Sequence, residues 1–533
     1  MEVFQKMLDL LIENGLIIDG TGNPGYRGAV GVEGDTVRIF RGDVSSVEAA
    51  RTIDATDHVV CPGFIDMHAH SGLVILSEPQ HEPKVRQGIT TELIGVDGNS
   101  YAPFRSHDDF LRFVELNAGL DGHPPSRGRW STVEQYLNMF DRKVAVNIAY
   151  ILGNSPVRID AVGWEDRPAT AGQLRDMKAI IREAMEEGTF GMSTGLDYPP
   201  GQYADTDELV ELSKQVADLG GIYHTHVRNT LGDRFLDPFR EAIEIGRRSG
   251  VPVHITHFHQ KTPSPTGGGG DRLIRLVEDA VERDQDVTFD SWPYVLGSSR
   301  TIRVLPAWAH DGGPEKLKAV MRSKEGRERL RQEVRPLALS WHDRWLTYFS
   351  KPENHKYEGR SVGEIADMTG KHPVDALCDL LLEENLQISH VSSSANPLTL
   401  PAFVTHPLSM VGSDAVLLGD FPAPRNYGCF PLILAEYVRE ERQMSLPNAI
   451  RKMTSFPAQR LGILDRGVLR DGLRADITVF HPKKVRAPGT RTEPKQFPIG
   501  IEYVIVNGTV VVDQNRHTGA LPGRALKHGR AST

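Results

Sequence analysis

The chain has 533 residues, of which 39% are hydrophobic, and it carries a formal net charge of −9. It is therefore long enough to bury a large core, and its negative charge offers no attraction for nucleic acid or an anionic membrane. Its three cysteines are widely spaced and predict no disulfide framework. No apolar run approaches the roughly 20 residues that span a bilayer, and the N-terminus lacks the basic segment and cleavage site of a secretory signal. We expect a cytoplasmic protein without nucleic-acid or membrane partners; the sequence leaves its oligomeric state open.

Both ends of the chain contain short apolar runs separated by tight-turn signals. Near the N-terminus these signals are Asn14-Gly15 and Glu33-Gly34-Asp35, and near the C-terminus the signal is Asn507-Gly508. Because two β segments flank one long middle region, we expect the two termini to meet and to build one domain together. The predicted bounds are 1–61 and 461–533 for this domain, and 62–460 for the middle.

The middle region alternates short apolar segments with longer amphipathic helices. One such helix is predicted at 205–221, with Asp205 or Thr206 as its N-cap. A first strand ends near Asp66, and seven further apolar segments follow at 89–98, 144–154, 190–196, 221–228, 251–259, 286–294 and 409–416. This α/β pattern of eight repeats predicts a parallel (β/α)8 TIM-like barrel. Charged helical sequence at about 300–353 predicts an inserted lid, and the Pro- and Gly-rich run 262–270 predicts a loop at the barrel mouth.

The first predicted strand is followed by two histidines in the stretch PGFIDMHAH. Because side chains alternate along a strand, His68 and His70 point the same way and are spaced to hold one metal ion. Taken alone, the pair fits equally well two histidines that only form hydrogen bonds. Residues at the ends of the other predicted strands decide between a metal site and a hydrogen-bonded pair.

Further polar side chains follow other predicted strands at their carboxyl ends, where TIM barrels place their active sites. These residues are Asp97, His226, His257 and Asp414. Imidazoles and carboxylates are ligands that suit Zn²⁺ or another borderline divalent ion. Because six such groups gather at one predicted rim, we interpret them as a metal site. His224 faces the same way as His226 by strand parity.

Several stretches resemble the amidohydrolase superfamily and, within it, the D-aminoacylase (N-acyl-D-amino-acid deacylase) branch. They are PGFIDMHAHS at 62–71, STGLDYPPGQYA at 193–204, THVRN at 225–229, GSD at 412–414, YVIVNGTVVV at 503–512 and VDQNRHTGALPGRALK at 512–527. The resemblance covers nearly the whole chain. It implies a (β/α)8 barrel with a β-sandwich made from both termini, in agreement with the pattern above.

The resemblance also implies roles for individual residues. His226 and His257 match ligands of a tightly held zinc ion, and His68 and His70 match ligands of a second, weaker site, so one or two Zn²⁺ ions per chain are expected. Asp414 matches the catalytic carboxylate that activates water.

The predicted substrate pocket combines a family residue with several departures from the family pattern. Tyr198 matches a pocket residue, and Ser298 and Arg228 are expected to join it. His259 stands where the branch has a lysine that meets the substrate carboxylate, and Trp292 replaces a tyrosine. A further departure lies at the metal site, where Asp97 takes the place of a cysteine ligand.

The resulting functional hypothesis is a metal-dependent hydrolase that cleaves an amide C–N bond of a small molecule with metal-activated water. Asp414 acts first as general base and then as general acid. An N-acyl-D-amino acid is the first substrate expected, but the altered carboxylate pocket favours a bulkier amide without a free carboxylate. Alternatives are hydrolysis of a carbamate, a cyclic amide or an aminated ring, and a scaffold without catalytic activity. Retention of the four histidines and Asp414 argues against a scaffold.

Overall fold

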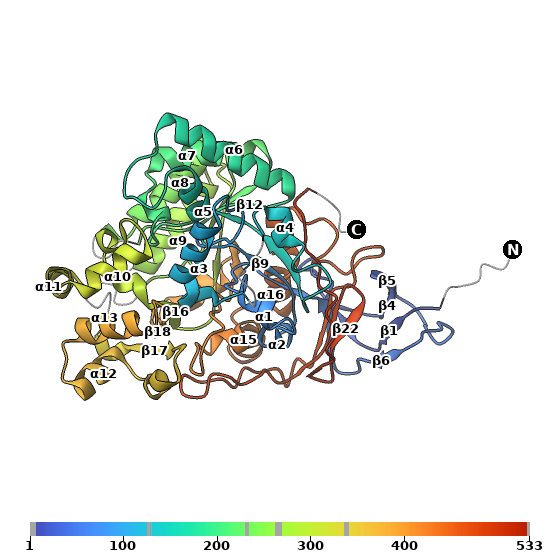
Figure 1. The fold of residues 1–533 in the computed structure, drawn as a ribbon. Helices are drawn as coiled ribbons and strands as arrows, with labels where there is room; N and C mark the ends of the chain where they lie inside the picture. The colour runs from blue at the N-terminus through green and yellow to red at the C-terminus, as the bar shows by residue number, and fades with distance from the viewer. Residues whose placement is uncertain are drawn as a thin grey trace.

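In the computed structural model, a barrel of parallel strands occupies the middle of the chain (Figure 1). The structure describes residues 7–124, 128, 130–229, 234–261, 269–334 and 340–529. Within these residues, eight strand positions follow in order around the barrel: β8 (Phe64–Asp66), β9 (Ile89–Ile94), β10 (Asn147–Tyr150) continued by β11 (Leu152–Gly153), β12 (Gly191–Gly195), β13 (Ile222–His226), β14 (Val253–Ile255), β15 (Val287–Ser291) and β19 (Ser409–Val411). All eight coincide with the predicted apolar segments.

The barrel is closed by contacts between its first and last strands. The backbone N–H of Met67 donates to the carbonyl of Val411 at 3.1 Å, and Ala69 forms a parallel bridge with Ala415. Every residue of β9, β12 and β13 is buried, as expected for strands that helices cover on the outside. The predicted TIM-like barrel is therefore confirmed.

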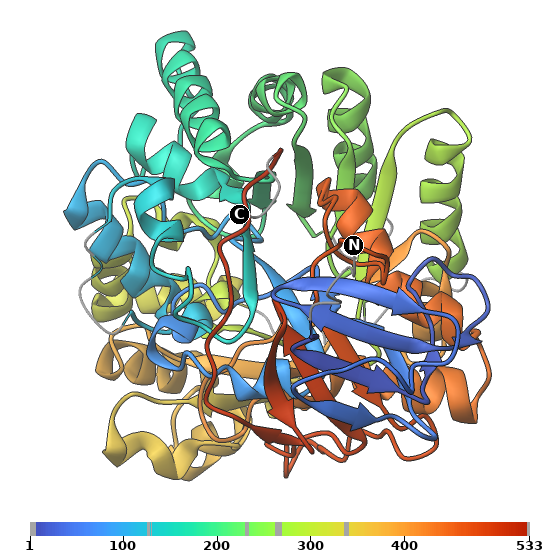
Figure 2. The same ribbon diagram turned by 90° about the vertical axis from the view of Figure 1, so that its right-hand side faces the viewer.

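Helices return the chain between the strands on the outside of the barrel (Figures 1 and 2). In α7 (Thr206–Asp218), Asp205 is the N-cap, and its carboxylate accepts from the N–H of Glu208 at 2.8 Å. The other helices outside the inserted segment are α1 (Val74–Ser77), α2 (Glu82–Val85), α3 (His107–Asp121), α4 (Val133–Leu137), α5 (Asn154–Ala161), α6 (Ala171–Glu187), α8 (Asp237–Ser249), α9 (Gly269–Val281), α14 (Leu400–Thr405), α15 (Arg425–Leu432), a π-helix (Ile433–Glu440), α16 (Leu446–Met453) and α17 (Ser455–Leu461).

The two ends of the chain form a β-sandwich (Figure 2). One sheet has the order β5-β4-β1-β6 and uses only N-terminal strands: β1 (Leu10–Glu13), β4 (Ala29–Glu33), β5 (Thr36–Phe40) and β6 (Thr52–Asp54). The other has the order β23-β22-β21-β20-β7-β2-β3 and joins β2 (Leu16–Ile17), β3 (Tyr26–Arg27) and β7 (Val59–Pro62) to β20 (Ile477–Phe480), β21 (Ile501–Val506), β22 (Thr509–Asp513) and β23 (Arg516–His517). Side chains of both sheets, among them Val32 and Val479, share one apolar core, so the prediction that the termini meet is confirmed.

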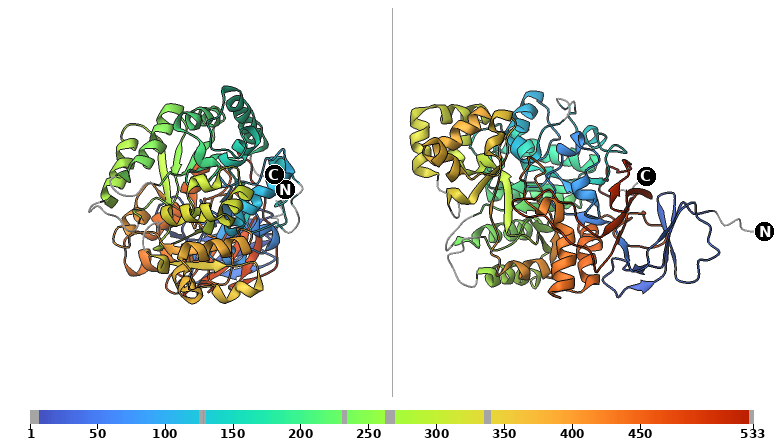
Figure 3. Two further views of the ribbon diagram at one scale, coloured as in Figure 1. Left: turned by 60° about the vertical axis from the view of Figure 1, so that its left-hand side comes forward. Right: turned by 90° about the horizontal axis from the view of Figure 1, so that it is seen from below.

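A large insertion separates β15 from β19. It contains an antiparallel sheet of order β16-β18-β17, formed by β16 (Leu296–Arg300), β17 (Arg344–Tyr348) and β18 (Ser389–Ser393). Its helices are α10 (Pro314–Arg322), α11 (Lys324–Glu333), α12 (Val362–Thr369) and α13 (Pro373–Glu383). The insertion and the N-terminal sheet lie at opposite ends of the molecule (Figures 1 and 3). The insertion is thus more extensive than the predicted lid at about 300–353.

Two further expectations concern the loop at the barrel mouth and membrane-spanning helices. The loop predicted at 262–270 falls mostly on residues 262–268, which lie outside the described residues. In the part of the chain that the structure describes, no helix is both long enough and apolar enough to cross a membrane.

Candidate metal centre and its cavity

Six predicted side chains converge at the carboxyl ends of the barrel strands. Asp97 lies at their centre, where its Oδ2 is 3.3 Å from His226 Nδ1 and 3.7 Å from His257 Nε2. The same oxygen is 3.5 Å from His68 Nε2 and 3.8 Å from His70 Nε2. One buried carboxylate oxygen therefore faces four imidazole nitrogens. Asp97 and the four histidines meet because each lies at the carboxyl end of a parallel barrel strand, and these ends share one rim.

These side chains fall into two groups that share Asp97 and that are spaced to hold a metal ion: His68, His70 and Asp97, and Asp97, His226 and His257. Within each group imidazole nitrogens face one another, with 2.7 Å between His226 Nδ1 and His257 Nε2 and 3.4 Å between the Nε2 atoms of His68 and His70. Burial, reinforced by Lys261 and His226, lowers the pKa of His257 to about 4, so its imidazole is neutral. Although burial opposes protonation, neighbouring aspartates raise the pKa of His68 and, to about 9, that of His70. Imidazoles gathered around a carboxylate are ligands that suit Zn²⁺ or a similar divalent ion.

Carboxylates hold the outer nitrogens of three of these histidines. His70 Nδ1 is 3.3 Å from Asp121, His226 Nε2 is 3.0 Å from Asp197, and His68 Nδ1 is 3.6 Å from Asp290. A carboxylate behind a histidine fixes its ring orientation and raises its basicity as a metal ligand. The sequence reasoning missed all three. Asp197 directly follows the strand predicted at 190–196, which is a usable signal, but Asp290 lies within the strand predicted at 286–294 and Asp121 ends helix α3.

Asp290 also organises the barrel interior below the site. Its Oδ1 accepts from the backbone N–H of His257 at 2.8 Å, and its Oδ2 lies 3.1 Å from His254 Nε2. His224 stacks on His254 with ring centroids 5.0 Å apart, and its Nε2 is 3.1 Å from the carbonyl oxygen of Met67. His224 therefore contacts the backbone, and together with His68 and Asp290 it forms a third group that is spaced to hold a metal ion.

A buried lysine ties the first strand of the barrel to the last. Lys84 donates to Asp66 and, at 2.7 Å, to Ser413 Oγ, and its Nζ lies 2.9 Å from Glu92 Oε1. Asp66 in turn accepts from the backbone N–H groups of His68 at 3.1 Å and Ser413 at 2.8 Å. This network fixes the backbone on both sides of the site, next to His68 and next to Asp414.

Asp414 lies between His70 and a buried arginine. Its Oδ1 is 3.2 Å from His70 Nε2, and its Oδ2 accepts from Arg425 Nη2 at 2.8 Å. Although burial opposes ionisation, Arg425 and the hydrogen bond with His70 hold the pKa of Asp414 below its ordinary range. The side chain is therefore an ionised carboxylate that can accept a proton through Oδ1 while Arg425 holds Oδ2. Arg425, which begins helix α15, was not predicted from the sequence.

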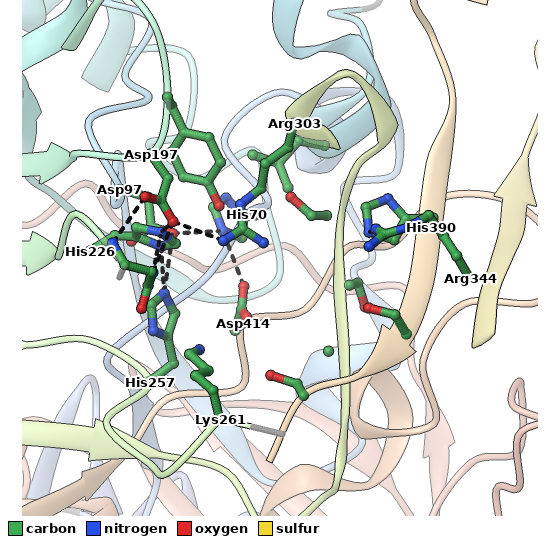
Figure 4. Close-up of a pocket in the computed structure, with 18 of the residues that line it drawn as sticks. His70, Asp97, Asp197, His226, His257, Lys261, Arg303, Arg344, His390 and Asp414 are labelled. Carbon is green, nitrogen blue, oxygen red and sulfur yellow. Dashed lines mark hydrogen bonds and ion pairs between the residues drawn. The ribbon is translucent and has the colours of Figure 1, made fainter. Parts of the chain in front are cut away.

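A cavity of about 280 Å³ opens onto this centre (Figure 4). Of the residues predicted for the metal site, His70, Asp97, His226, His257 and Asp414 line it, while His68 is fully buried behind them. Of those predicted for the substrate pocket, Tyr198, Trp292 and Ser298 line it. The ring of Tyr198 packs on His226 with centroids 4.7 Å apart.

The two other predicted pocket residues lie elsewhere. Arg228 points away from the cavity, because Glu241 at 3.0 Å and the carbonyl oxygen of Gln202 at 2.7 Å hold its guanidinium in a separate surface depression. His259 is buried beside the cavity, where its ring packs on Trp292 at 5.1 Å and its Nε2 is 3.2 Å from Ser394 Oγ. Neither side chain is among the residues that line the cavity.

The cations of the cavity come from other positions. Lys261, two residues after His259, lines it, as do Arg303 and Arg344 from the inserted segment. Burial, together with Arg303, lowers the pKa of Lys261 to about 8, and burial, together with Lys261, holds the pKa of His259 well below its ordinary value. Arg303 is paired with Asp197 at 2.8 Å. At neutral pH the charge near His259 is therefore carried by Lys261.

Comparison with known proteins agrees with this geometry. The model of the amidohydrolase family matches residues 51–512. D-aminoacylase of Alcaligenes xylosoxydans xylosoxydans is 32% identical over 519 residues, covering 97% of each chain, and N-acyl-D-glutamate deacylase of the same organism is 31% identical, covering 98% of this chain and 97% of the relative.

Solved structures of D-aminoacylase and of an N-acyl-D-glutamate deacylase also resemble this chain. A crystal structure of D-aminoacylase superposes with a TM-score of 0.81 at 30% identity. N-acyl-D-glutamate deacylase from Bordetella bronchiseptica, in complex with zinc and a phosphonate mimic of the tetrahedral intermediate, superposes with a TM-score of 0.83 at 29% identity. Both matches cover 98% of this chain and 100% of the other. A dihydropyrimidinase from Brevibacillus agri, with a TM-score of 0.60 at 14% identity, shares the fold.

Proposed function

Because this chain belongs to the amidohydrolase family and is a metal-dependent hydrolase of carbon–nitrogen bonds other than peptide bonds, we propose that it removes the acyl group from N-acyl-D-amino acids. The observation that carries the proposal is the convergence of Asp97, four imidazoles and Asp414 in one cavity of a barrel that resembles D-aminoacylase over its whole length. The expected products are a carboxylic acid and a D-amino acid.

The proposed metal is Zn²⁺, one or two ions per chain. His226, His257 and Asp97 would hold one ion, and His68 and His70 a second, with the carboxylate of Asp97 shared between them. When bound, the ion supplies Lewis acidity, which polarises the scissile carbonyl and lowers the pKa of water towards about 7. Elemental analysis of protein purified without added metal tests this assignment. A protein without stoichiometric metal, whose activity a chelator leaves unchanged, would contradict it.

Asp414 is proposed to move the proton of the reaction. Arg425 holds one carboxylate oxygen, so the other, beside His70, is placed to take a proton from the attacking water and to pass it to the leaving nitrogen. Asp121 and Asp197 keep the imidazoles of His70 and His226 in fixed orientations during this transfer.

The carboxylate of the substrate is proposed to meet a pocket that differs from that of the family. His259 brings no charge, as its buried neutral ring indicates, but Lys261 lines the cavity beside His257 and supplies a cation (Figure 4). Lys261 therefore favours an acidic substrate over the neutral amide that the replacement at His259 suggests from the sequence. A non-carboxylate amide, carbamate, cyclic amide or aminated ring remains the second candidate because of the neutral ring of His259.

A substrate panel distinguishes these candidates. We expect the zinc-loaded enzyme to hydrolyse N-acetyl-D-methionine at least tenfold faster, in kcat/KM, than its L-enantiomer and than N-acetyl-D-methioninamide, which lacks the carboxylate. Faster turnover of the methioninamide, or of a cyclic amide such as dihydrouracil, would support the second candidate and contradict the first. Asp414→Asn, which should be inactive on every substrate, is the control for contaminating hydrolases.

A further inference from the structure

The wall of the cavity that faces the metal-ligand groups belongs to the inserted sheet. In its register, Gly297 of β16 and Arg344 of β17 lie opposite Ser392 of β18, and Ser299 lies opposite His390 two positions along. Side chains two residues apart on a strand share a face, so these residues form one continuous surface. All five line the cavity. In Figure 4, Arg344 and His390 lie on the opposite side of the cavity from His226 and His257.

Arg344 is a buried cation without a counter-ion in the described part of the chain. Its side chain is only 6% exposed, one of its Nη atoms donates to His390 Nε2, and its Nε has no hydrogen-bond partner. Arg303 and Arg425, by contrast, have carboxylate partners, Asp197 and Asp414 respectively. Burial, followed by Arg303, lowers the pKa of Arg344 to about 10, which leaves it charged at neutral pH. Fully buried arginines are normally paired.

The neighbours of Arg344 offer further donors. Burial, with Arg344 beside it, holds the pKa of His390 well below its ordinary value, so the ring is neutral. Because His390 Nε2 accepts from Arg344, the proton of the ring resides on Nδ1, which has no partner. The hydroxyl group of Ser299, on the same face, also lacks a hydrogen-bond partner. The Nε–H of Arg344, an imidazole N–H and one hydroxyl thus lack partners on this wall.

We propose that this wall, formed by Arg344, His390 and Ser299, is an anion-binding subsite that receives a second negatively charged group of the substrate. A carboxylate at the end of the substrate's side chain is the group it fits, since a planar guanidinium flanked by an imidazole N–H and a hydroxyl matches carboxylate oxygens. This inference rests on the proposed function: the scissile amide lies at Asp414, Lys261 meets the α-carboxylate, and the side chain extends across the cavity. The substrate class is an N-acylated, acidic D-amino acid.

The test compares acidic substrates with their uncharged isosteres. For the wild-type enzyme we expect kcat/KM for N-acetyl-D-glutamate to exceed that for N-acetyl-D-glutamine at least tenfold. N-acetyl-D-aspartate and N-acetyl-D-2-aminoadipate have shorter and longer side chains, so their kcat/KM values show which side-chain length places the carboxylate in the subsite. Arg344→Gln should lower this preference at least tenfold, mainly through KM for the acid, while turnover of the glutamine derivative stays within threefold. Arg344→Lys, which retains the charge, should keep part of the preference.

Arg360→Gln is the matched control, because Arg360 is an exposed arginine of the same insertion. It should leave the preference unchanged. Equal preference in wild type and Arg344→Gln, with the glutamine derivative still hydrolysed, would overturn the subsite while leaving the proposed deacylase function intact.

Binding of glutarate by calorimetry separates failure of the subsite from failure of the proposed function. Glutarate should bind the metal-loaded wild type at least tenfold more tightly than it binds Arg344→Gln, whatever reaction the enzyme catalyses. If no N-acyl-D-amino acid is hydrolysed but this difference is found, the subsite stands and the proposed function fails. If glutarate binds both proteins equally, the subsite is refuted.

Discussion

Replacing Asp414 by asparagine is the sharpest test of the proposed chemistry. The amide has nearly the shape of the carboxylate and can still accept a hydrogen bond from Arg425, which lies 2.8 Å from Oδ2. The oxygen near His70 Nε2, at 3.2 Å, is replaced by a group that cannot take up a proton. The change therefore removes proton transfer from Asp414 and retains most of its packing.

The expected effect follows from this geometry. General acid–base catalysis contributes roughly 10²–10⁴-fold to a rate, which corresponds to about 2.7–5.5 kcal/mol of transition-state stabilisation. We therefore expect kcat of Asp414→Asn to fall by at least about 100-fold. KM should change little, since the cations that meet the substrate lie at Lys261 and Arg344.

The assay measures kcat and KM on N-acetyl-D-amino acids together with the zinc content of each protein. Asp420→Asn is a suitable control because Asp420 is exposed and pairs with Lys495 at the surface. If Asp414→Asn retains more than about a tenth of wild-type kcat, a loss below ~1.4 kcal/mol, Asp414 is not the general base. Unchanged zinc content ensures that a loss of activity reports proton transfer.

Three further predictions follow from the described contacts. Asp97→Ala should weaken zinc binding by about 100-fold or more, which exceeds the 10–100-fold loss typical when a residue behind a metal ligand is changed, whereas Asp97→Cys should still bind zinc. Equal zinc affinity in wild type and Asp97→Ala would place Asp97 outside the metal site. Lys84→Met should lower the free energy of unfolding in urea by about 3–5 kcal/mol, since it leaves Asp66 and Glu92 buried without their cation; a loss below about 1 kcal/mol would contradict this. Lys261, whose pKa burial lowers to about 8, is charged below that pH, so kcat/KM for carboxylate substrates should fall as pH rises through 8, and a Lys261→Met variant with the same alkaline decline would refute this origin.

The barrel and its rim could be predicted because both depend on local sequence. Buried parallel strands are short apolar runs, and the residues that follow them lie at one rim whatever the helices between them do. Asp97, His226, His257 and Asp414 were predicted on this ground, and the structure places them together.

The carboxylates behind the histidines could not be predicted in the same way. Asp121 meets His70 only because helix α3 ends beside the first strand, and that position depends on packing between segments far apart in sequence. Arg425 meets Asp414 from the first turn of α15 for the same reason. The structure also places Arg228, which was expected in the substrate pocket, outside the cavity, because Glu241 holds its guanidinium there.

The insertion shows the limit of pattern reasoning most clearly, and it is also the part that bears on substrate choice. Its charged helices were recognised, but β16, β17 and β18 have only five residues each and lie far apart in the chain, so no local signal pairs them. Their pairing alone brings Arg344 beside His390 and sets both across the cavity from the metal-ligand groups. In the proposed mechanism, catalysis and recognition of the α-carboxylate depend on the barrel rim, whereas selection of a second negative charge depends on the inserted sheet. Variants of Arg344 and of Asp414 should accordingly separate these functions, the first changing which substrate is preferred and the second lowering turnover of every substrate alike.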